Sequence, residues 1–517
     1  MMHLFESLDA ILLAALLLLA LARKLNVPYP TLLAAAGIGF ALLPFVPDIA
    51  VDPQLALALF IAPALLHAAY HTSLRGLRRY WFPLVSLAVF AVIVTTAAVT
   101  FVGMAAGGLS FAAAFALGAI VAPPDAAAAE AVLSEIGIPR RGMLLLQGES
   151  LLNDATALLL FGLAVAMANH TDTAATPWVL AAAAPAGALF GLACGWAYLR
   201  IVPIFAGTLG SSLADFAVTF AIWLAAERLH LSPVLAVVAF GLLVAQRRPA
   251  GQPARDRIQS KAVWAAAVLV LNVVAFLLMG LQSRDIVSKL SPSERLPALG
   301  FALLVLVTVL IVRLAWVFLV RAIEGVIVRR YAPAWLPEPP PWSASLVLGW
   351  SGMRGLVTLA AAFALPHALP GRDLIVLSAF AVVIGTLVVQ GLTLGPLIRW
   401  FGSDEDAGLA AKIGTARRQV IHAGLHALDD DDTSDAANAL RVRYGAAHDV
   451  ASNAEDPQAP SEFDRLHLKV LEQQRAELNT MRESGDLAED VYRRLLEELD
   501  WSEVEARSYS DNMLRSA

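Results

Sequence analysis

Residues 148–154 read GESLLND, which places two acids and an amide inside an otherwise apolar run that extends from 141 to 168. If the run is a helix, Ser150 and Asp154 are four residues apart and share one face, whereas Glu149 and Asn153 lie about 100° around it. An ionisable side chain at the middle of a membrane costs roughly 2.5–3.5 kcal/mol, so each acid needs a reason to be there. One face can present a hydroxyl and a carboxylate to a cavity while the other fixes the helix to its neighbours. The alternative is a cluster that only joins helices by hydrogen bonds.

The composition of the whole chain excludes an ordinary soluble protein. Of 517 residues, 58% are hydrophobic and 15% are charged, with a mean hydropathy of +0.67. Soluble domains have about 45–50% apolar and about 25% charged residues. A disordered, collagen-like or coiled-coil chain is excluded as well. The single cysteine, Cys194, rules out an intrachain disulfide and a thiolate metal cluster.

The net charge of −6 is the sum of two opposite parts. Residues 1–400 contain 24 Lys and Arg against 18 Asp and Glu, which gives +6; residues 401–517 contain 13 against 25, which gives −12. We therefore expect a membrane domain, residues 1–400, and an acidic, partly helical cytoplasmic tail, residues 401–517. The basic runs are too short to indicate a nucleic-acid partner.

The membrane domain contains thirteen stretches that approach the length of about 20 apolar residues needed to cross a bilayer as a helix. They do not alternate apolar and polar residues as the strands of a barrel would. The sequence thus predicts an all-α integral membrane protein with about thirteen transmembrane helices in the lipid bilayer. The expected spans are 4–22, 28–47, 53–70, 80–106, 109–134, 141–168, 177–199, 211–228, 231–246, 258–281, 296–321, 343–366 and 374–398.

The lysines and arginines between these spans predict the orientation. If the C-terminus is cytoplasmic, only Arg228, Arg284, Lys289, Arg295 and Arg372 lie in outside loops. Of the other basic residues of the membrane domain, all but two fall in cytoplasmic loops, as the positive-inside rule requires. We expect a multi-pass protein of the cell (inner) membrane with its N-terminus outside, because the first span has basic residues after it and none before it.

Two spans carry signals of an interrupted helix. The fifth contains Ala122-Pro123-Pro124-Asp125 near its middle, and the twelfth contains GWSGMRG at 349–355. Prolines remove helix hydrogen bonds, and broken backbone at membrane depth is tolerated only where protein or a cavity satisfies it. The two interruptions occupy corresponding places in the halves formed by spans 1–6 and 8–13. This arrangement predicts two inverted six-helix repeats with broken helices 5 and 12, the pattern of a transporter site, unless the interruptions are ordinary kinks.

The buried arginines need partners. Arg354 needs a counter-charge, and we expect Glu149 to supply it as a structural ion pair. Arg313 is close enough to the cytoplasmic end of its span to extend to the interface. Asp215, at the start of its span, is expected at the interface.

Taken together, these stretches resemble the first monovalent cation:proton antiporter family, the NhaP-like sodium/proton exchangers. The resemblance covers roughly residues 1–400. It rests, in this order along the chain, on Val121–Ala127, Gly148–Asp154, Glu227–Ala245, Phe276–Leu281 and Trp350–Leu359.

The resemblance implies a thirteen-helix fold with a six-helix core domain and a dimerisation domain, and a homodimer. It implies that Asp154 binds the cation and the proton, with Ser150 as a hydroxyl ligand. It also implies that Asn153 marks an electroneutral exchanger, and that Glu149 and Arg354 form the stabilising pair. The break at Pro123 and Pro124 would add backbone carbonyl ligands for the cation.

The chain departs from the family pattern at three places. Pro123-Pro124-Asp125 exchanges the usual order of Asp and Pro, so Asp125 is expected to cap a half-helix. His67 stands where the third helix usually carries an acid, and an imidazole cannot replace a carboxylate as a sodium ligand. Glu130 stands where a small or hydroxyl residue is usual, and we hypothesise that it restores the negative charge lost at His67.

The expected function is secondary active exchange of Na⁺ for H⁺ at one buried aspartate by alternating access, one cation for one proton. Such a protein serves pH and sodium homeostasis, is not an enzyme and needs no cofactor. Alternatives are exchange of K⁺ or Li⁺ for H⁺ and a channel-like or non-transporting sensor with the same fold. A hydrolase built on Ser150 is disfavoured because no matching nucleophile motif is present. In the tail, residues 429–460 are expected to be disordered, and a helix is expected to follow them. This helix is expected to serve assembly or tethering, or else to sense pH.

Overall fold

The computed structural model is helical, with no β-strand among the residues that it describes. The chain divides into two compact units, Met1–Ser403 and Asp404–Ala517. The all-α fold predicted from the sequence is confirmed. The described residues are 2–25, 27–43, 55, 57–125, 128–130, 133, 140–168, 176–205, 208, 210–247, 254–288, 291–331, 338–401, 407–427, 434–453, 462–484 and 489–506.

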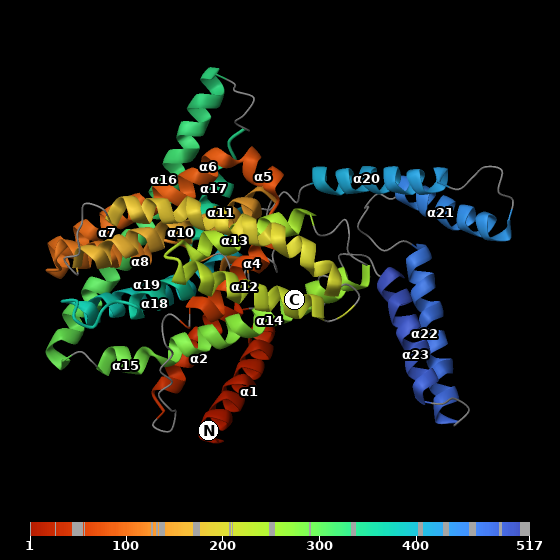
Figure 1. Ribbon diagram of the computed structural model, residues 1–517, viewed down its shortest axis with the longest axis horizontal. Coiled ribbons are helices and arrows are strands. Elements are labelled where there is room, and N and C mark those ends of the chain that lie inside the picture. Colours follow the sequence, from red (N-terminus) through yellow and green to blue (C-terminus); the bar gives the residue numbers. More distant parts are fainter. Residues whose placement is uncertain are drawn as a thin grey trace. The chain divides into compact units, whose positions relative to one another are not determined.

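The first unit is a set of closely packed helices (Figure 1). Each of the thirteen expected spans overlaps at least one of them. Among the described residues, six helical segments are long and apolar enough to cross a membrane by length and composition. In chain order the elements are α1 (Met2–Leu25), α2 (Tyr29–Ala41), the π-helical η1 (Leu57–Ile61), α4 (Ala62–His71), α5 (Leu74–Arg79), α6 (Trp81–Val85), the π-helical η2 (Ser86–Phe90), α7 (Ala91–Gly107), α8 (Phe111–Val121), α10 (Arg140–Ala168), α11 (Thr176–Ile201), the short 3₁₀ turn η3 (Val202–Phe205), α12 (Gly210–Arg228), α13 (Pro233–Arg247), α14 (Ala254–Leu281), α15 (Ser283–Ser288), α16 (Pro292–Tyr331), α17 (Trp342–Trp350), α18 (Leu356–Phe363) and α19 (Arg372–Phe401).

The sequence marks the boundary between α12 and α13 with turn and capping residues. His230 adopts a positive φ of 56° just after α12. The Ser232 hydroxyl accepts a hydrogen bond from the Leu235 N–H at 3.4 Å, and Pro233 occupies the first position of α13, where a missing N–H is harmless. The expected break at 231–233 is therefore present.

Glycines allow a close contact between α2 and α14. A Cβ at Gly37 of α2 would lie 2.5 Å from the Leu277 carbonyl of α14, and one at Gly280 of α14 would lie 2.3 Å from the Ala34 carbonyl of α2. Only glycine at both positions lets the two backbones touch. This contact holds α2 against the helix that carries Asn272.

The buried apolar side chains form two main clusters, and α10 lies between them. Leu145, Leu146 and Ala164 of α10 belong to a cluster shared with α8, α16 and α19. Leu151 and Ala155 of the same helix belong to a cluster shared with α4, α11, α12 and α13. The polar stretch at 148–154 is therefore at the junction of two cores.

The second unit consists of two helical hairpins, α20 with α21 and α22 with α23. Their bounds are Ala407–His426, Asp435–Asn453, Glu462–Glu483 and Glu489–Ala506. The disorder expected over 429–460 is wrong for 435–453, because Ser434 caps α21 by accepting from the Ala437 N–H at 3.2 Å. The remainder of 429–460, apart from Ser434 itself, lies outside the described residues. Arg475 of α22 pairs with Asp500 and Glu503 of α23, which closes the second hairpin.

Candidate functional site: two broken helices beside α10

The polar residues of α10 include two acids and an amide that are buried inside the first unit. Glu149, Asn153 and Asp154 are 1%, 0% and 5% exposed. Ser150, one turn before Asp154, is half-buried. The helix therefore presents its polar stretch to protein on all sides, as expected from its place between two cores.

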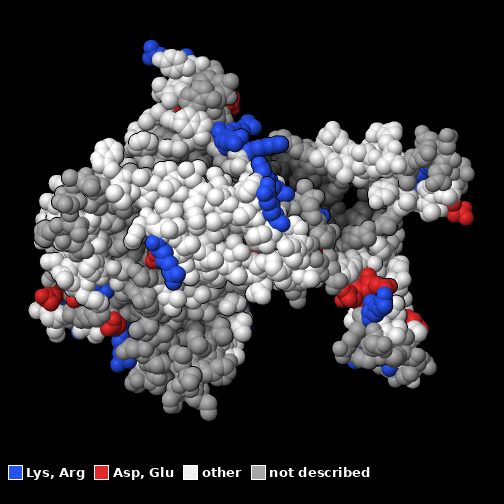
Figure 2. All heavy atoms as spheres, in the orientation of Figure 1, with Lys and Arg blue, Asp and Glu red and all other residues white. Residues whose placement is uncertain are grey.

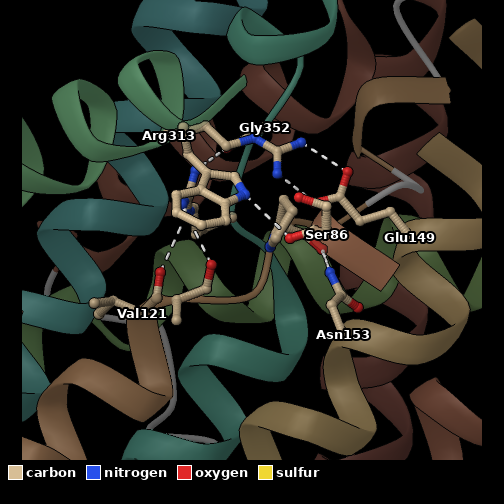
Figure 3. A network of polar contacts seen from close by, with 10 residues as sticks. Ser86, Val121, Glu149, Asn153, Arg313 and Gly352 are labelled. Atoms are coloured by element: carbon tan, nitrogen blue, oxygen red, sulfur yellow. Dashed lines mark hydrogen bonds and ion pairs between the residues drawn. The ribbon is translucent and has the colours of Figure 1, made fainter. Parts of the chain in front are cut away.

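Glu149 is neutralised by Arg313 of α16. The two guanidinium nitrogens Nη1 and Nη2 each donate to one carboxylate oxygen, the second at 2.7 Å (Figure 3). Both side chains are at most 2% exposed. The ion pair expected between Glu149 and Arg354 is not formed, and Arg313 does not extend to the interface as we expected.

Arg354 instead binds backbone carbonyls, because it lies inside an interruption where carbonyls have lost their helix partners. Helix α17 ends at Trp350 and α18 begins at Leu356, while α8 ends at Val121. The Arg354 side chain donates to the carbonyls of Gly352, of Val121 at 3.2 Å and of Ala122 at 3.4 Å (Figure 3). Its donors thus join the two interruptions that the sequence predicted at 122–125 and 349–355.

Asp125 makes a second link between the interruptions. Its N–H donates to the Met353 carbonyl at 2.7 Å, and its Oδ2 accepts from the Leu356 N–H at 3.3 Å. The carboxylate therefore lies at the N-terminus of α18, where a negative charge is favourable. A Cβ at Gly355 would lie 1.7 Å from that Oδ2, so glycine is needed for this approach.

Asn153 ties α10 to the same place, because its side-chain amide donates to the Pro124 carbonyl at 2.8 Å (Figure 3). Asp154 follows directly and is close enough to Asp125 for the two carboxylates to interact electrostatically. In the described part of the chain no cationic side chain pairs with Asp154. Two acids on one helix thus differ: Glu149 is paired with a cation, whereas the structure describes no cationic side chain paired with Asp154.

The three departures from the family pattern lie in this neighbourhood. Glu130 accepts a hydrogen bond from Gln147 and is within electrostatic range of Asp125 and His71. The His67 and His71 rings are 4.3 Å apart between centroids, and the buried Nδ1 of His67 has no partner among the described residues. Glu130 and the two histidines therefore belong to one polar region.

Sequence reasoning missed four residues of the site. Tyr29 of α2 hydrogen-bonds Asn272 of α14 and is within electrostatic range of Asp125 and Glu130. Thr386 of α19 accepts from the Arg354 N–H at 3.0 Å. Arg313 was considered only as an interfacial residue. Arg313, Asn272 and Thr386 lie inside expected apolar spans, whereas Tyr29 is at the start of one. The sequence shows each of these polar residues without showing its partner.

Comparisons with known proteins identify the family of the chain. The family model described as sodium/hydrogen exchanger, transmembrane, matches residues 11–400. An uncharacterized Na⁺/H⁺ exchanger of Mycobacterium tuberculosis is 30% identical over 518 residues, covering 95% of this chain and 94% of the relative. A sodium, potassium, lithium and rubidium/H⁺ antiporter of Bacillus pumilus is 30% identical over 455 residues, covering 82% of this chain and 67% of the relative.

The fold also matches a solved structure. The sodium proton antiporter MjNhaP1 from Methanocaldococcus jannaschii superposes with a TM-score of 0.58 at 18% identity, covering 77% of this chain and 98% of that one. A likeness at this identity establishes the fold alone. The family model spans three quarters of the chain and describes a transmembrane exchanger, so the family is one of multi-pass membrane transporters rather than enzymes. The chain belongs to the transmembrane sodium/hydrogen exchanger family.

Proposed function

We propose that this antiporter exchanges Na⁺ for H⁺ at one buried carboxylate, Asp154, by alternating access. The observation that carries the proposal is the contrast between the two acids of α10: Arg313 neutralises Glu149, whereas Asp154 has no cationic partner among the described residues. A buried carboxylate without a fixed counter-charge needs a mobile one. A proton and a sodium ion both satisfy this need, and they compete for it.

Oxygen atoms near Asp154 can complete the cation's coordination. The Ser150 hydroxyl lies one helical turn before it, and Pro123 and Pro124 lie after the end of α8, so their carbonyls are not part of a regular helix. The Pro124 carbonyl accepts from Asn153 and keeps a second lone pair. Unwound backbone carbonyls at broken helices are ligands that transporters use for Na⁺.

The interruptions also supply fixed charge. Asp125 caps α18, so it offsets the positive end of that half-helix and adds a negative charge near Asp154. Arg354 keeps both interruptions together through their carbonyls. We assign Asp125 and Arg354 to the shape of the site and Asp154 to the transported ions.

Exchange follows from the cost of carrying charge. Asp154 is close to neutral when it holds either a proton or a cation, and it is negative when empty. Moving an uncompensated charge through the membrane barrier is unfavourable. The two loaded forms therefore change between inward-facing and outward-facing states, and the empty form does not, which makes the exchange obligatory.

A stoichiometry of one proton for each cation is supported by the residues around the carrier. Asn153, next to Asp154, has no titratable proton. Between residues 374 and 398, the expected final span of the second half contains no charged side chain, so it offers no second carboxylate carrier. The exchange is then electroneutral.

An alternative to Na⁺/H⁺ exchange is that another monovalent cation is transported. The Bacillus pumilus and Bacillus subtilis relatives are named antiporters of sodium, potassium, lithium and rubidium. K⁺/H⁺ or Li⁺/H⁺ exchange at the same carboxylate is therefore the second candidate. A channel-like sensor is the third, and it would conduct current without competition between protons and cations.

We further propose a homodimer in the cell membrane, with the N-terminus outside and the acidic tail, 401–517, in the cytoplasm. The asymmetry of arginine and lysine between the expected loops supports this orientation. In this setting the antiporter would serve pH and sodium homeostasis.

Ion-resolved exchange in proteoliposomes tests the proposal. An imposed pH gradient should drive Na⁺ movement in the wild type, with Na⁺ and H⁺ competing, and Asp154→Asn should abolish it. Asn153→Ser, which keeps a neutral side chain, is expected to weaken exchange without abolishing it. Full exchange by Asp154→Asn would refute the assignment of the carrier, and equal rates with K⁺ alone would favour the second candidate.

A further inference from the structure

A second group of charged side chains lies around Tyr80, where α5 leads into α6 and where α10 begins. The guanidinium carbons of Arg79 and Arg141 are 5.9 and 5.0 Å from the centroid of the Tyr80 ring. Two helical segments are long enough to span a membrane, Trp81–Gly107 and Arg141–Ala168: Arg79 lies two residues before the first, and Arg141 begins the second. The group therefore lies at a membrane boundary.

Arg321 of α16 adds a third positive charge. Its guanidinium carbon is 4.4 Å from the Trp342 ring centroid, and the side chain is within electrostatic range of Arg141. Glu324, which is 2% exposed, opposes them and reaches Arg141 at 3.6 Å. These three arginines outnumber the one carboxylate that pairs with them among the contacts described, Glu324.

Among the described residues, the group has two buried guanidinium Nε donors without a partner and one such acceptor, Oε1 of Glu324. Arg141 donates to the Glu338 carbonyl and pairs with Glu324, yet its buried Nε has no partner among the described residues. The Nε of Arg321 is buried and unpartnered in the same sense. Buried donors are nearly always paired, and one carboxylate oxygen of Glu324 is a small supply of acceptors for two guanidinium groups, so the group has room for a further anion.

We infer that Arg79, Arg141 and Arg321 bind the phosphate group of an anionic phospholipid. Phosphate oxygens accept from several guanidinium groups at once, which suits both the surplus of arginines over the carboxylate and the unpartnered donors. The lipid is favoured over a dissolved phosphate because aromatic rings typical of the membrane interface surround the arginines, with Trp342 54% exposed. Basic side chains gather near α5 on the face that Figure 2 shows.

Binding of phosphatidylglycerol to the purified full-length protein tests this site. Arg79→Gln with Arg321→Gln should weaken phosphatidylglycerol binding roughly 30-fold, since each arginine near an anionic headgroup is worth about 1 kcal/mol, a factor of about five. Native mass spectrometry or the lipid-dependent rise in melting temperature measures the effect. Phosphatidylcholine, which has no net charge, should bind weakly to both proteins.

Arg200→Gln is the matched control, because Arg200 is an exposed arginine that also stacks on an aromatic ring, Trp196, at 3.6 Å. It should bind phosphatidylglycerol like the wild type. If the double glutamine variant fails to fold, the double variant Arg79→Lys with Arg321→Lys replaces it. It keeps the positive charges and should retain most of the affinity for phosphatidylglycerol. That affinity should fall as salt is added, because salt screens the attraction. Equal binding of both lipids, unchanged binding by the glutamine variant, or displacement of the lipid by millimolar inorganic phosphate would each overturn the assignment.

Discussion

Arg313 of α16 holds both carboxylate oxygens of Glu149, five residues before Asp154 on the same helix. The pair fixes α10 to α16 next to the residue that we propose as the carrier. It also explains how one helix can keep two buried acids that behave differently: the first has a permanent counter-charge, and the second depends on what it binds. The first prediction follows from this difference.

Removing one member of the Glu149–Arg313 pair should destabilise the protein strongly. Glu149→Gln or Arg313→Gln leaves the partner charge buried and uncompensated, which typically costs about 3–5 kcal/mol. Combining the two substitutions removes both charges and should recover most of the loss. Melting temperatures of the detergent-solubilised protein measure the effect, with Asp154→Asn as the control, since it breaks no ion pair and should melt like the wild type. Additive losses in the double variant would show that the two residues act independently.

Gly355 should be intolerant of a single added methyl group. The Cβ of Gly355→Ala would lie 1.7 Å from Oδ2 of Asp125, so the carboxylate must leave the N-terminus of α18. We expect a several-fold rise in the apparent KM for Na⁺, because losing a helix cap costs roughly 1 kcal/mol and misplaces the charge near Asp154. The matched control is Gly39→Ala, since a Cβ at Gly39 meets nothing within 4 Å. A Cβ at Gly355 would also lie 2.9 Å from the Cβ of Asp125, so the test background is Asp125→Gly, which removes both atoms. If Asp125 transmits the effect, Gly355→Ala adds little there; an equally large added loss would contradict this route.

Much of this architecture could be predicted from the sequence, because hydropathy and proline positions indicate where individual helices lie and where they end. The apolar runs located the helices, and Pro123-Pro124 located the end of α8 within a few residues. The 148–154 stretch located the site because charge is unfavourable in a membrane wherever it lies. These inferences need no knowledge of which helices are neighbours.

The partners could not be predicted for the same reason. Sequence showed that Glu149 needed a cation, but two arginines, Arg313 and Arg354, were available, and the choice depends on how α16 packs against α10. Arg354 was the natural candidate because it lies in the second interruption, yet that interruption also frees the carbonyls that it binds instead. The Tyr29–Asn272 contact is likewise a product of the α2–α14 crossing.

If Glu130 supplies the negative charge that His67 lacks, moving the carboxylate from position 130 to position 67 should preserve exchange. Glu130→Gln alone is expected to reduce exchange markedly, and adding His67→Asp should restore it toward the wild-type rate. Both residues lie in the polar region that includes His71, within which Glu130 interacts electrostatically with Asp125. Na⁺-driven proton movement in proteoliposomes measures the four proteins of this cycle. A double variant as inactive as the worse single variant would rule out compensation.

Exchange should be insensitive to the membrane potential. With one proton exchanged for one cation, no net charge crosses, so a potassium–valinomycin potential of either sign should leave the initial rate of Na⁺-driven proton movement unchanged. Each additional elementary charge moved would couple the cycle to about 2.3 kcal/mol per 100 mV, which is large enough to detect. The residues able to add such a charge are Glu130, Asp125 and His67, the three at which the chain departs from the family pattern. A clear voltage dependence that disappears in Glu130→Gln would assign the extra proton to Glu130, and one that persists in that variant would leave Asp125 or His67 as its source.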